Sequence, residues 1–255
     1  MFVHFGKRFS RRKLGFAADF CPICREVRAF RISEVRHVTH LNYIPLGKGD
    51  LVHHEALCQR CDTIQPIATL PYSACVPAHK GDAFDLAART HPDIGDTRAE
   101  LIELERRADE GTLEPSQRAT IIARAIAALD YAARLRKHDG SIRPGAAASG
   151  VVSLLAVLAA AFAWSDPNAG WIARTVTTVI ALGTFLLTVR LAMGSKRWWA
   201  AKFAYPKLAR ALIPLAPTRD ELLAATASVS SGGAEITRLI DVDDLERFLH
   251  RSDAR

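Results

Sequence analysis

Two pairs of cysteines carry most of the chemistry that this sequence offers. Each pair has two residues between its cysteines: the first is Cys21 and Cys24, and the second is Cys58 and Cys61. Four thiolates are the ligand set of a tetrahedral structural zinc site, and a site with four protein ligands has no open position for water or substrate. The spacing therefore predicts a bound Zn²⁺ ion that stabilises a fold and takes no part in catalysis.

Other residues near these pairs offer alternative ligands. His53 and His54 lie just before the second pair, and either imidazole could take the place of a thiolate. Cys75 has no second cysteine beside it, and His79 alone does not complete another site, so we expect a free thiol in a proline-rich linker. Zinc binding requires reduced cysteines, which favours a cytosolic location over a disulfide framework, the competing interpretation.

The segments around the cysteines must bring the two pairs together. Apolar and polar residues alternate imperfectly from Val27 to Val38, which predicts a half-exposed strand. A returning strand is expected from Leu51 to Leu57, and a third at Thr63–Ile64. Three such short strands bury little apolar surface, so metal binding is expected to supply much of the folding free energy.

A basic run precedes the first cysteine pair. Ser10–Leu14 contains a double arginine like that of an export signal, but Asp19 interrupts the apolar stretch that such a signal needs. We therefore expect no export, and we interpret the run as a solvated or lipid-facing arm.

The order of these features resembles that of a known family. His4–Arg8 is followed by Cys-Pro-x-Cys, by a turn that ends at Tyr43–Leu46, and by the second Cys-x-x-Cys pair. This pattern is similar to the small zinc-ribbon domains found at bacterial N-termini, and it covers about the first 70 residues. Those domains favour Gly after each pair, whereas this chain has Arg25 and Asp62. The resemblance implies a zinc-ribbon fold and a bound metal, without a defined activity.

From Gly81 onward the pattern becomes helical. Asp96 and Thr97, followed by Glu100, match the signature of a capping box at the start of a helix. Gly111 is expected to end that helix, because glycine readily adopts the conformation that follows a helix C-terminus.

A second helix is expected to begin at Pro115 and to continue through Leu135 with one apolar face. Asp130 and Arg134 are placed four residues apart, where they can form an ion pair. The two helices are interpreted as an antiparallel hairpin whose apolar face packs within this chain rather than against a partner.

Two long apolar runs follow the helical segment. The first, 146–164, contains no charged residue and would span about 28 Å as a helix, close to the hydrocarbon thickness of a bilayer. The second, 171–193, has Arg174 near its start and follows a polar turn at Ser165–Gly170. These runs predict a transmembrane helical hairpin rather than two buried helices of a soluble bundle.

Small residues are spaced for close packing within this hairpin. Ser149 and Ser153 lie four residues apart in the first run, as do Ala156 and Ala160. Such residues let two helix backbones approach each other, and we expect them to pack against the region of Gly183 in the second run.

Lysine and arginine residues lie on both outer sides of the hairpin. They precede it from Arg134 to Arg143 and follow it from Lys196 to Lys207, whereas the connecting turn contains none. The positive-inside bias therefore predicts cytoplasmic termini. Together with the family resemblance, this predicts a two-pass protein of the bacterial cytoplasmic membrane, with the lipid bilayer as one partner.

The tail after the hairpin combines bases, aromatic residues and short helices. Bases alternate with Trp, Phe and Tyr over 196–205, which we interpret as an interfacial anchor. Thr218 with Glu221 predicts one helix start, Gly232 and Gly233 a break, and Asp241 another helix start.

The expected organisation is α+β and has several parts. These are a zinc ribbon at 1–72, a linker with a cytoplasmic helical hairpin at 73–143, a transmembrane hairpin at 144–194, and a basic and aromatic segment with a cytoplasmic helical tail at 195–255. The formal net charge is +7, and what matters is that lysine and arginine residues are concentrated on both outer sides of the apolar runs.

The sequence contains no nucleophile elbow and no phosphate-binding glycine loop. We therefore expect a protein that is not an enzyme, has no small-molecule substrate and serves as a scaffold for a cytoplasmic protein partner. Two alternatives stay open: a membrane-tethered nucleic-acid-binding protein that uses a face formed by Arg28, Arg31 and Arg36, and an auxiliary subunit of a membrane enzyme.

Overall fold

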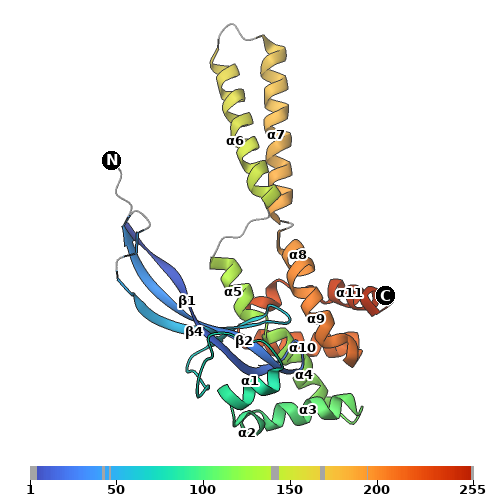
Figure 1. Ribbon diagram of the computed structural model, residues 1–255. Coiled ribbons are helices and arrows are strands. Elements are labelled where there is room, and N and C mark those ends of the chain that lie inside the picture. Colours follow the sequence, from blue (N-terminus) through green and yellow to red (C-terminus); the bar gives the residue numbers. More distant parts are fainter. Residues whose placement is uncertain are drawn as a thin grey trace. The chain divides into compact units, whose positions relative to one another are not determined.

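The computed structural model describes residues 5–41, 44–45, 47–138, 144–166, 170–193 and 195–253 (Figure 1). The features predicted at His4, at Tyr43–Leu46 and in the turn at Ser165–Gly170 fall wholly or partly outside these ranges. The chain forms two compact units, one containing the described residues up to Leu135 and from Tyr205 onward, and the other those from Arg136 to Ala204. The predicted α+β class is confirmed.

An antiparallel sheet forms the N-terminal part of the first unit. Its strand order is β1-β2-β4-β5, and the two-residue β3 also pairs with β2. The three strands predicted from the sequence correspond to β2, β4 and β5. The strands are β1 (Phe5–Cys21), β2 (Glu26–Leu41), β3 (Ile44–Pro45), β4 (Asp50–Cys58) and β5 (Ile64–Ile67).

The basic run at Ser10–Leu14 is part of β1 rather than a separate arm. Arg11 pairs with Val35 of β2, and Arg12 pairs with Glu34, while the arginine side chains stay exposed. A bulge follows, and Gly15 there has a φ of 157°. A Cβ on Gly15 would lie 2.6 Å from the carbonyl oxygen of Val76, so only glycine lets that loop bond to the edge of β1.

The second strand, β2, is partly exposed, as predicted, at Glu26 and Arg31, but it buries apolar residues on both of its faces. Phe30 and Ile32 are fully buried on one face, and Val35 is buried on the other. Because apolar residues occupy both faces, the alternation along β2 is imperfect, as expected for a strand in the middle of a sheet.

In the described part of the chain, five α-helices lie between the sheet and the first long apolar helix. The capping box predicted at Asp96–Glu100 is absent from the described residues: Thr97 ends one helix, and the next begins after Arg98 with no side-chain cap. The helix predicted from Pro115 through Leu135 is interrupted at Ala128 and becomes two. The helices are α1 (Ala83–Thr90), α2 (Ile94–Thr97), α3 (Ala99–Asp109), α4 (Pro115–Ala127) and α5 (Asp130–His138).

The first helix, α1, covers part of the sheet. Leu86 and Ala87 of α1 form a buried cluster with Ala18 of β1, and Val27 and Ala29 of β2 pack against it. In addition, the Thr90 side chain accepts a hydrogen bond from the Ala18 backbone at 3.1 Å. These contacts fix α1 beside the strand end that carries the first cysteine pair.

From Tyr205 onward the tail belongs to the same unit as the sheet. The predicted cap at Thr218 is confirmed, since its hydroxyl accepts a hydrogen bond from the Glu221 backbone at 3.3 Å. Asp241 accepts similarly from the backbone of Asp243 at 3.0 Å. The tail contains α9 (Tyr205–Leu212), η2 (Ile213–Leu215), α10 (Arg219–Ser231), η3 (Glu235–Arg238) and α11 (Val242–Asp253).

The apolar face of α4 packs within the chain, as predicted, and its main neighbour is α10 of the tail. Ile122 and Ile126 of α4 and Leu222 of α10 are fully buried. Arg118 of α4 forms an ion pair with Glu221 and donates a hydrogen bond to the Ala216 carbonyl at 3.0 Å. The unit is therefore assembled from segments that lie far apart in the sequence.

The second unit contains two long apolar helices, α6 (Pro144–Ser165) and α7 (Trp171–Met193), followed by α8 (Ser195–Trp199) and the π-helix η1 (Ala200–Ala204). Both long helices are sufficiently long and apolar to cross a membrane, and only 6% of each candidate span is buried. Arg174 donates a hydrogen bond to the Asp166 carbonyl at 2.8 Å, and its guanidinium lies 5.6 Å from the Trp164 ring centroid. Its charge is thus held at the end of α7.

The seam between α6 and α7 differs in part from the predicted one. Ser153 and Ala181 are buried there, and the hydroxyls of Ser149 and Thr188 are 2.7 Å apart. Gly183 is exposed, and a Cβ on it would meet no atom within 4 Å. The small residues of α6 therefore face Ala181 and Thr188, not Gly183.

Candidate metal centre

The four predicted ligands lie together at one end of the sheet. The sulfur atoms of Cys21, Cys24, Cys58 and Cys61 all lie within 4.8 Å of one another. The Sγ atoms of Cys21 and Cys61 are 3.5 Å apart, and those of Cys24 and Cys58 are 3.9 Å apart. None of the four forms a disulfide. This cluster is able to hold a metal ion.

The strands explain why the two pairs meet. Cys21 is the last residue of β1 and Cys58 the last of β4, and both strands are neighbours of β2. Cys58 is directly opposite Phe30 of β2. Each pair continues into a tight turn, and in the first turn the backbone N–H of Cys24 donates a hydrogen bond to the sulfur of Cys21 at 3.5 Å.

The residue after each cysteine pair adopts a left-handed backbone conformation. Arg25 has a φ of 60° and Asp62 a φ of 54°. Their N–H groups donate hydrogen bonds to the carbonyls of Cys21, at 2.7 Å, and Cys58, at 3.0 Å. Glycine adopts this conformation at no steric cost, so the chain has the turns that normally carry glycine but builds them with other residues.

An ion pair holds Arg25 in this conformation. Its Nε atom lies 2.6 Å from an oxygen of Glu105 on α3, and both side chains are largely buried. The contact joins the first turn to a helix that follows much later in the chain. The side chain thus contributes an anchor that a glycine at this position would lack.

Two cations from the tail approach the second turn. Lys207 donates a hydrogen bond to the carbonyl of Asp62 at 2.7 Å, and Arg210 donates one to the carbonyl of Arg60 at 3.1 Å. Both belong to α9. Four thiolates around a divalent cation carry a net negative charge, and these two side chains place positive charge beside it.

The thiols strongly influence each other's ionisation. Hydrogen bonding with Cys24, Cys58 and Cys61, followed by burial, raises the pKa of Cys21. Hydrogen bonding with Cys21 and Cys24 lowers the pKa of Cys58 to about 7. Buried, neighbouring thiols cannot all lose their protons unless a cation replaces them, so full ionisation of the four is coupled to metal binding.

The alternative ligands do not join the cluster. Nε2 of His53 lies 2.6 Å from the hydroxyl of Tyr131. Among the described residues, the group of side chains that could hold a metal ion includes neither His53 nor His54. Cys75 is a free thiol, as predicted, and burial raises its pKa. His79 forms no such cluster with it in the described part of the chain.

His53 instead belongs to a polar group on the sheet. Tyr131 donates a hydrogen bond to Glu55 at 2.5 Å, and Arg11 forms an ion pair with Glu55 at 2.8 Å. Burial opposes ionisation of Glu55, but these hydrogen bonds outweigh it and lower its pKa. The group ties α5 to β1 and β4.

The basic face predicted from three arginines does not form. Side chains alternate along β2, so Arg28 and Arg36 point to one face and Arg31 to the other. Arg28 is paired with Glu26, and Arg36 with Glu34 at 2.8 Å. The three arginines therefore do not share one face of β2.

No protein-family model, curated protein or solved structure matches the chain. The zinc-ribbon resemblance thus rests on the cysteine pairs and the residues around them, and the family assignment stays a prediction.

Sequence reasoning found the four cysteines but missed their surroundings. Arg25 and Asp62 depart from glycine at both turns, and this double departure is the sign in the sequence that side chains compensate there. Lys207 and Arg210 gave no local sign, because nothing in the sequence of α9 shows that it returns to the second turn.

Proposed function

We propose that this chain is a membrane-anchored zinc protein that holds a cytoplasmic protein partner at the membrane. The sulfur spacing carries the metal assignment. In a tetrahedron with Zn–S bonds of about 2.3 Å, neighbouring sulfurs lie about 3.8 Å apart. Two of the six sulfur separations, 3.5 and 3.9 Å, bracket that value, and all six are within 4.8 Å.

The donor set supports zinc in a structural role. Thiolates are soft ligands that select zinc over hard cations such as Mg²⁺ and Ca²⁺, and zinc accepts tetrahedral geometry without strain. Cys21, Cys24, Cys58 and Cys61 would fill all four positions. Bound zinc would join the ends of β1 and β4 and neutralise thiolates that otherwise repel one another, which supports the assignment to the zinc-ribbon family.

The apolar hairpin supports anchoring in a bilayer. A helix in the core of a soluble protein buries its apolar side chains, whereas those of α6 and α7 are almost entirely exposed. Lysine and arginine flank the hairpin on its outer sides, and the reduced thiols require a reducing compartment. We therefore place both termini in the cytoplasm of a bacterium, with the hairpin crossing the cytoplasmic membrane twice.

A scaffold role fits the first unit best. The sheet, the helices and the tail are tied together by long-range contacts such as Arg118–Glu221 and Lys207–Asp62. The four thiols lie against one another and would be occupied by the metal, so they are not available as nucleophiles. A rigid unit attached to a membrane is suited to binding a partner there.

The functional proposal is tested by purification from membranes under two conditions. Full-length tagged protein is extracted in mild detergent, treated with nuclease and washed at low and at high salt. We expect a protein that co-purifies in a fixed ratio and is retained after both treatments. Its loss from the zinc-free variant Cys58→Ser, but not from the exposed-site control Lys80→Met, would link that binding to the folded first unit.

Two results would contradict the proposal. Recovery of nucleic acid with a steep salt dependence, and of no protein in a fixed ratio, would favour a nucleic-acid-binding function. Co-purification of a membrane enzyme through the hairpin alone, unaffected by Cys58→Ser, would favour an auxiliary subunit.

A further inference from the structure

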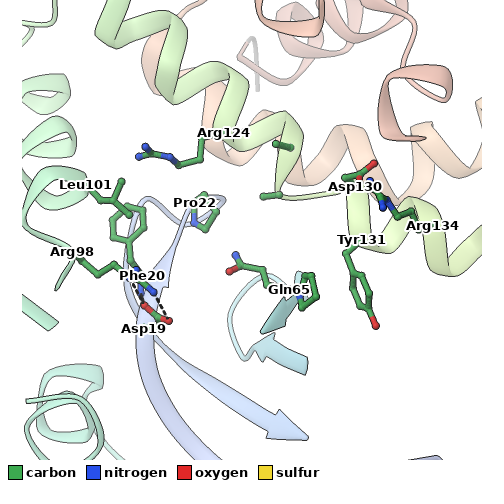
Figure 2. A pocket seen from close by; sticks show the side chains of 13 residues that line it. Asp19, Phe20, Pro22, Gln65, Arg98, Leu101, Arg124, Asp130, Tyr131 and Arg134 are labelled. Atoms are coloured by element: carbon green, nitrogen blue, oxygen red, sulfur yellow. Dashed lines mark hydrogen bonds and ion pairs between the residues drawn. The ribbon is translucent and has the colours of Figure 1, made fainter. Parts of the chain in front are cut away.

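A cavity of about 520 Å³ opens in the first unit beside the first cysteine pair (Figure 2). Its walls come from the end of β1, from β5 and from the helical segment between Arg98 and Arg134. Cavities that bind small organic molecules typically measure about 300–1,000 Å³. The proposed zinc site and membrane anchor make no use of this space.

Three guanidinium groups line the cavity, and they differ in their partners. Arg98 forms an ion pair with Asp19 at 3.0 Å, and Arg134 forms one with Asp130 at 2.7 Å. The guanidinium of Arg124, on α4, has no hydrogen bond or ion pair to any residue in the described part of the chain; Glu105, an acid that interacts with it electrostatically, is already paired with Arg25. The cavity therefore has one positive charge in excess, and it belongs to Arg124.

A second polar group in the wall also lacks a partner. Nε2 of Gln65 is buried and has no hydrogen-bond partner among the described residues. A buried donor without a partner is costly, and an acceptor atom placed in the cavity would satisfy it. Figure 2 shows Gln65, from β5, and Arg124, from α4, among the side chains that surround the space.

The rest of the wall is largely apolar. Phe20, Pro22, Pro66 and Leu101 contribute carbon surface, and Ala127 and Ala128 leave room because their side chains are short. Burying apolar ligand surface against such walls is favourable. The wall thus combines a free guanidinium and a free amide donor with apolar surface.

We propose that this cavity binds a carboxylate that carries an apolar group. Arg124 binds the carboxylate, Gln65 donates a hydrogen bond to one of its oxygens, and Phe20 and Leu101 contact the apolar part. Two sources offer this chemistry: a free carboxylic acid, and the C-terminal residue of a protein. The proposal depends on the proposed function only in requiring the zinc-bound fold.

The test measures binding of 3-phenylpropionate to the zinc-loaded, full-length protein in lipid nanodiscs by isothermal titration calorimetry. We expect saturable binding, and binding weaker by about tenfold or more for 3-phenylpropionamide, which has the same shape but no charge. Arg124→Gln should weaken binding of the acid by a similar factor. Arg89→Gln, an exposed position on α1 outside the cavity, should leave it unchanged within about twofold.

A second variant, measured together with its zinc content, distinguishes lost binding from misfolding. Gln65→Leu keeps the approximate size of the side chain and removes the amide donor, so it should weaken acid binding several-fold while zinc content stays at the wild-type value. A blocked tripeptide ending in Phe, compared with its C-terminal amide, distinguishes the sources: tighter binding of the peptide acid than of 3-phenylpropionate indicates a protein C-terminus, and equal binding indicates a free acid.

The proposal is overturned by any of three results in zinc-loaded protein. These are the absence of saturable binding by either acid, equal binding of acid and amide, or acid binding that Arg124→Gln does not change. Because zinc content is measured in the same samples, failure of this proposal is distinguishable from failure of the zinc assignment.

Discussion

Replacing Arg25 by glycine should destabilise the first unit, even though glycine suits its backbone conformation. Arg25 has a φ of 60°. That conformation costs a residue with a side chain about 1–2 kcal/mol. Glycine removes this strain but loses roughly 0.5–1 kcal/mol through the greater entropy of the unfolded chain. The net gain from the backbone is therefore about 1 kcal/mol at most.

The side chain decides the outcome. Arg25 and Glu105 lie 2.6 Å apart, and their side chains are only 9% and 12% exposed. Removing one partner of a buried ion pair costs about 3–5 kcal/mol, because the other charge stays buried without compensation. Subtracting the backbone gain, we expect Arg25→Gly to lower the free energy of unfolding by about 2–4 kcal/mol.

Hydrogen exchange of the zinc-saturated, full-length protein measures this change. The amides of β2 report opening of the first unit, whereas tryptophan fluorescence would not, because the described tryptophans all lie in the second unit. Asp62→Gly is the matched control: Asp62 has a φ of 54° and an exposed side chain, so its change should stay within about 1 kcal/mol. Equal or greater stability of Arg25→Gly would refute the reasoning.

The pH dependence gives an independent check. Burial raises the pKa of Glu105 even beside Arg25, and we expect loss of Arg25 to raise it further. An acid whose folded pKa is raised contributes stability at low pH, and this contribution is lost as the pH rises through the folded pKa. Arg25→Gly should thus cost more at about pH 8 than at about pH 5, just above the ordinary pKa of a glutamic acid, and adding Glu105→Gln should remove most of that difference.

Two further predictions concern the second turn and the membrane topology. Lys207→Met removes the cation bonded to a carbonyl of the second turn and should speed zinc transfer to a chelator by about tenfold, whereas Lys80→Met, at an exposed site, should not; equal rates would show that Lys207 does not support the site. In a Cys75→Ser background, Gly170→Cys should react with an impermeant thiol reagent in intact cells, and Ser230→Cys only after lysis. Labelling of the tail from outside would reverse the proposed orientation.

Local signals in the sequence were sufficient for the features that depend on few residues. Two Cys-x-x-Cys pairs specify four ligands whatever lies between them, and a charge-free run of sufficient length specifies a long apolar helix. The cap at Thr218 depends only on Thr218 and Glu221, and it formed as predicted. In each case the sequence contains every group that takes part.

Features that depend on distant partners could not be predicted in the same way. Strand β1 has no clear alternation in its basic half, because pairing with β2 rather than burial keeps it extended. The cap expected near Thr97 does not form, and the Thr97 hydroxyl donates a hydrogen bond to the Asp93 carbonyl at 3.0 Å instead. Similarly, no local pattern shows that α9 approaches the second turn or that Arg124 lacks a partner.

The zinc site is tested most directly by X-ray absorption at the zinc edge of the purified, full-length protein. We expect one zinc per chain with four sulfur neighbours at about 2.3 Å and no nitrogen or oxygen ligand. In Cys58→Ser the four-sulfur signature should disappear. A spectrum with an imidazole ligand, or protein that folds without stoichiometric zinc, would contradict the assignment of Cys21, Cys24, Cys58 and Cys61 as the complete ligand set.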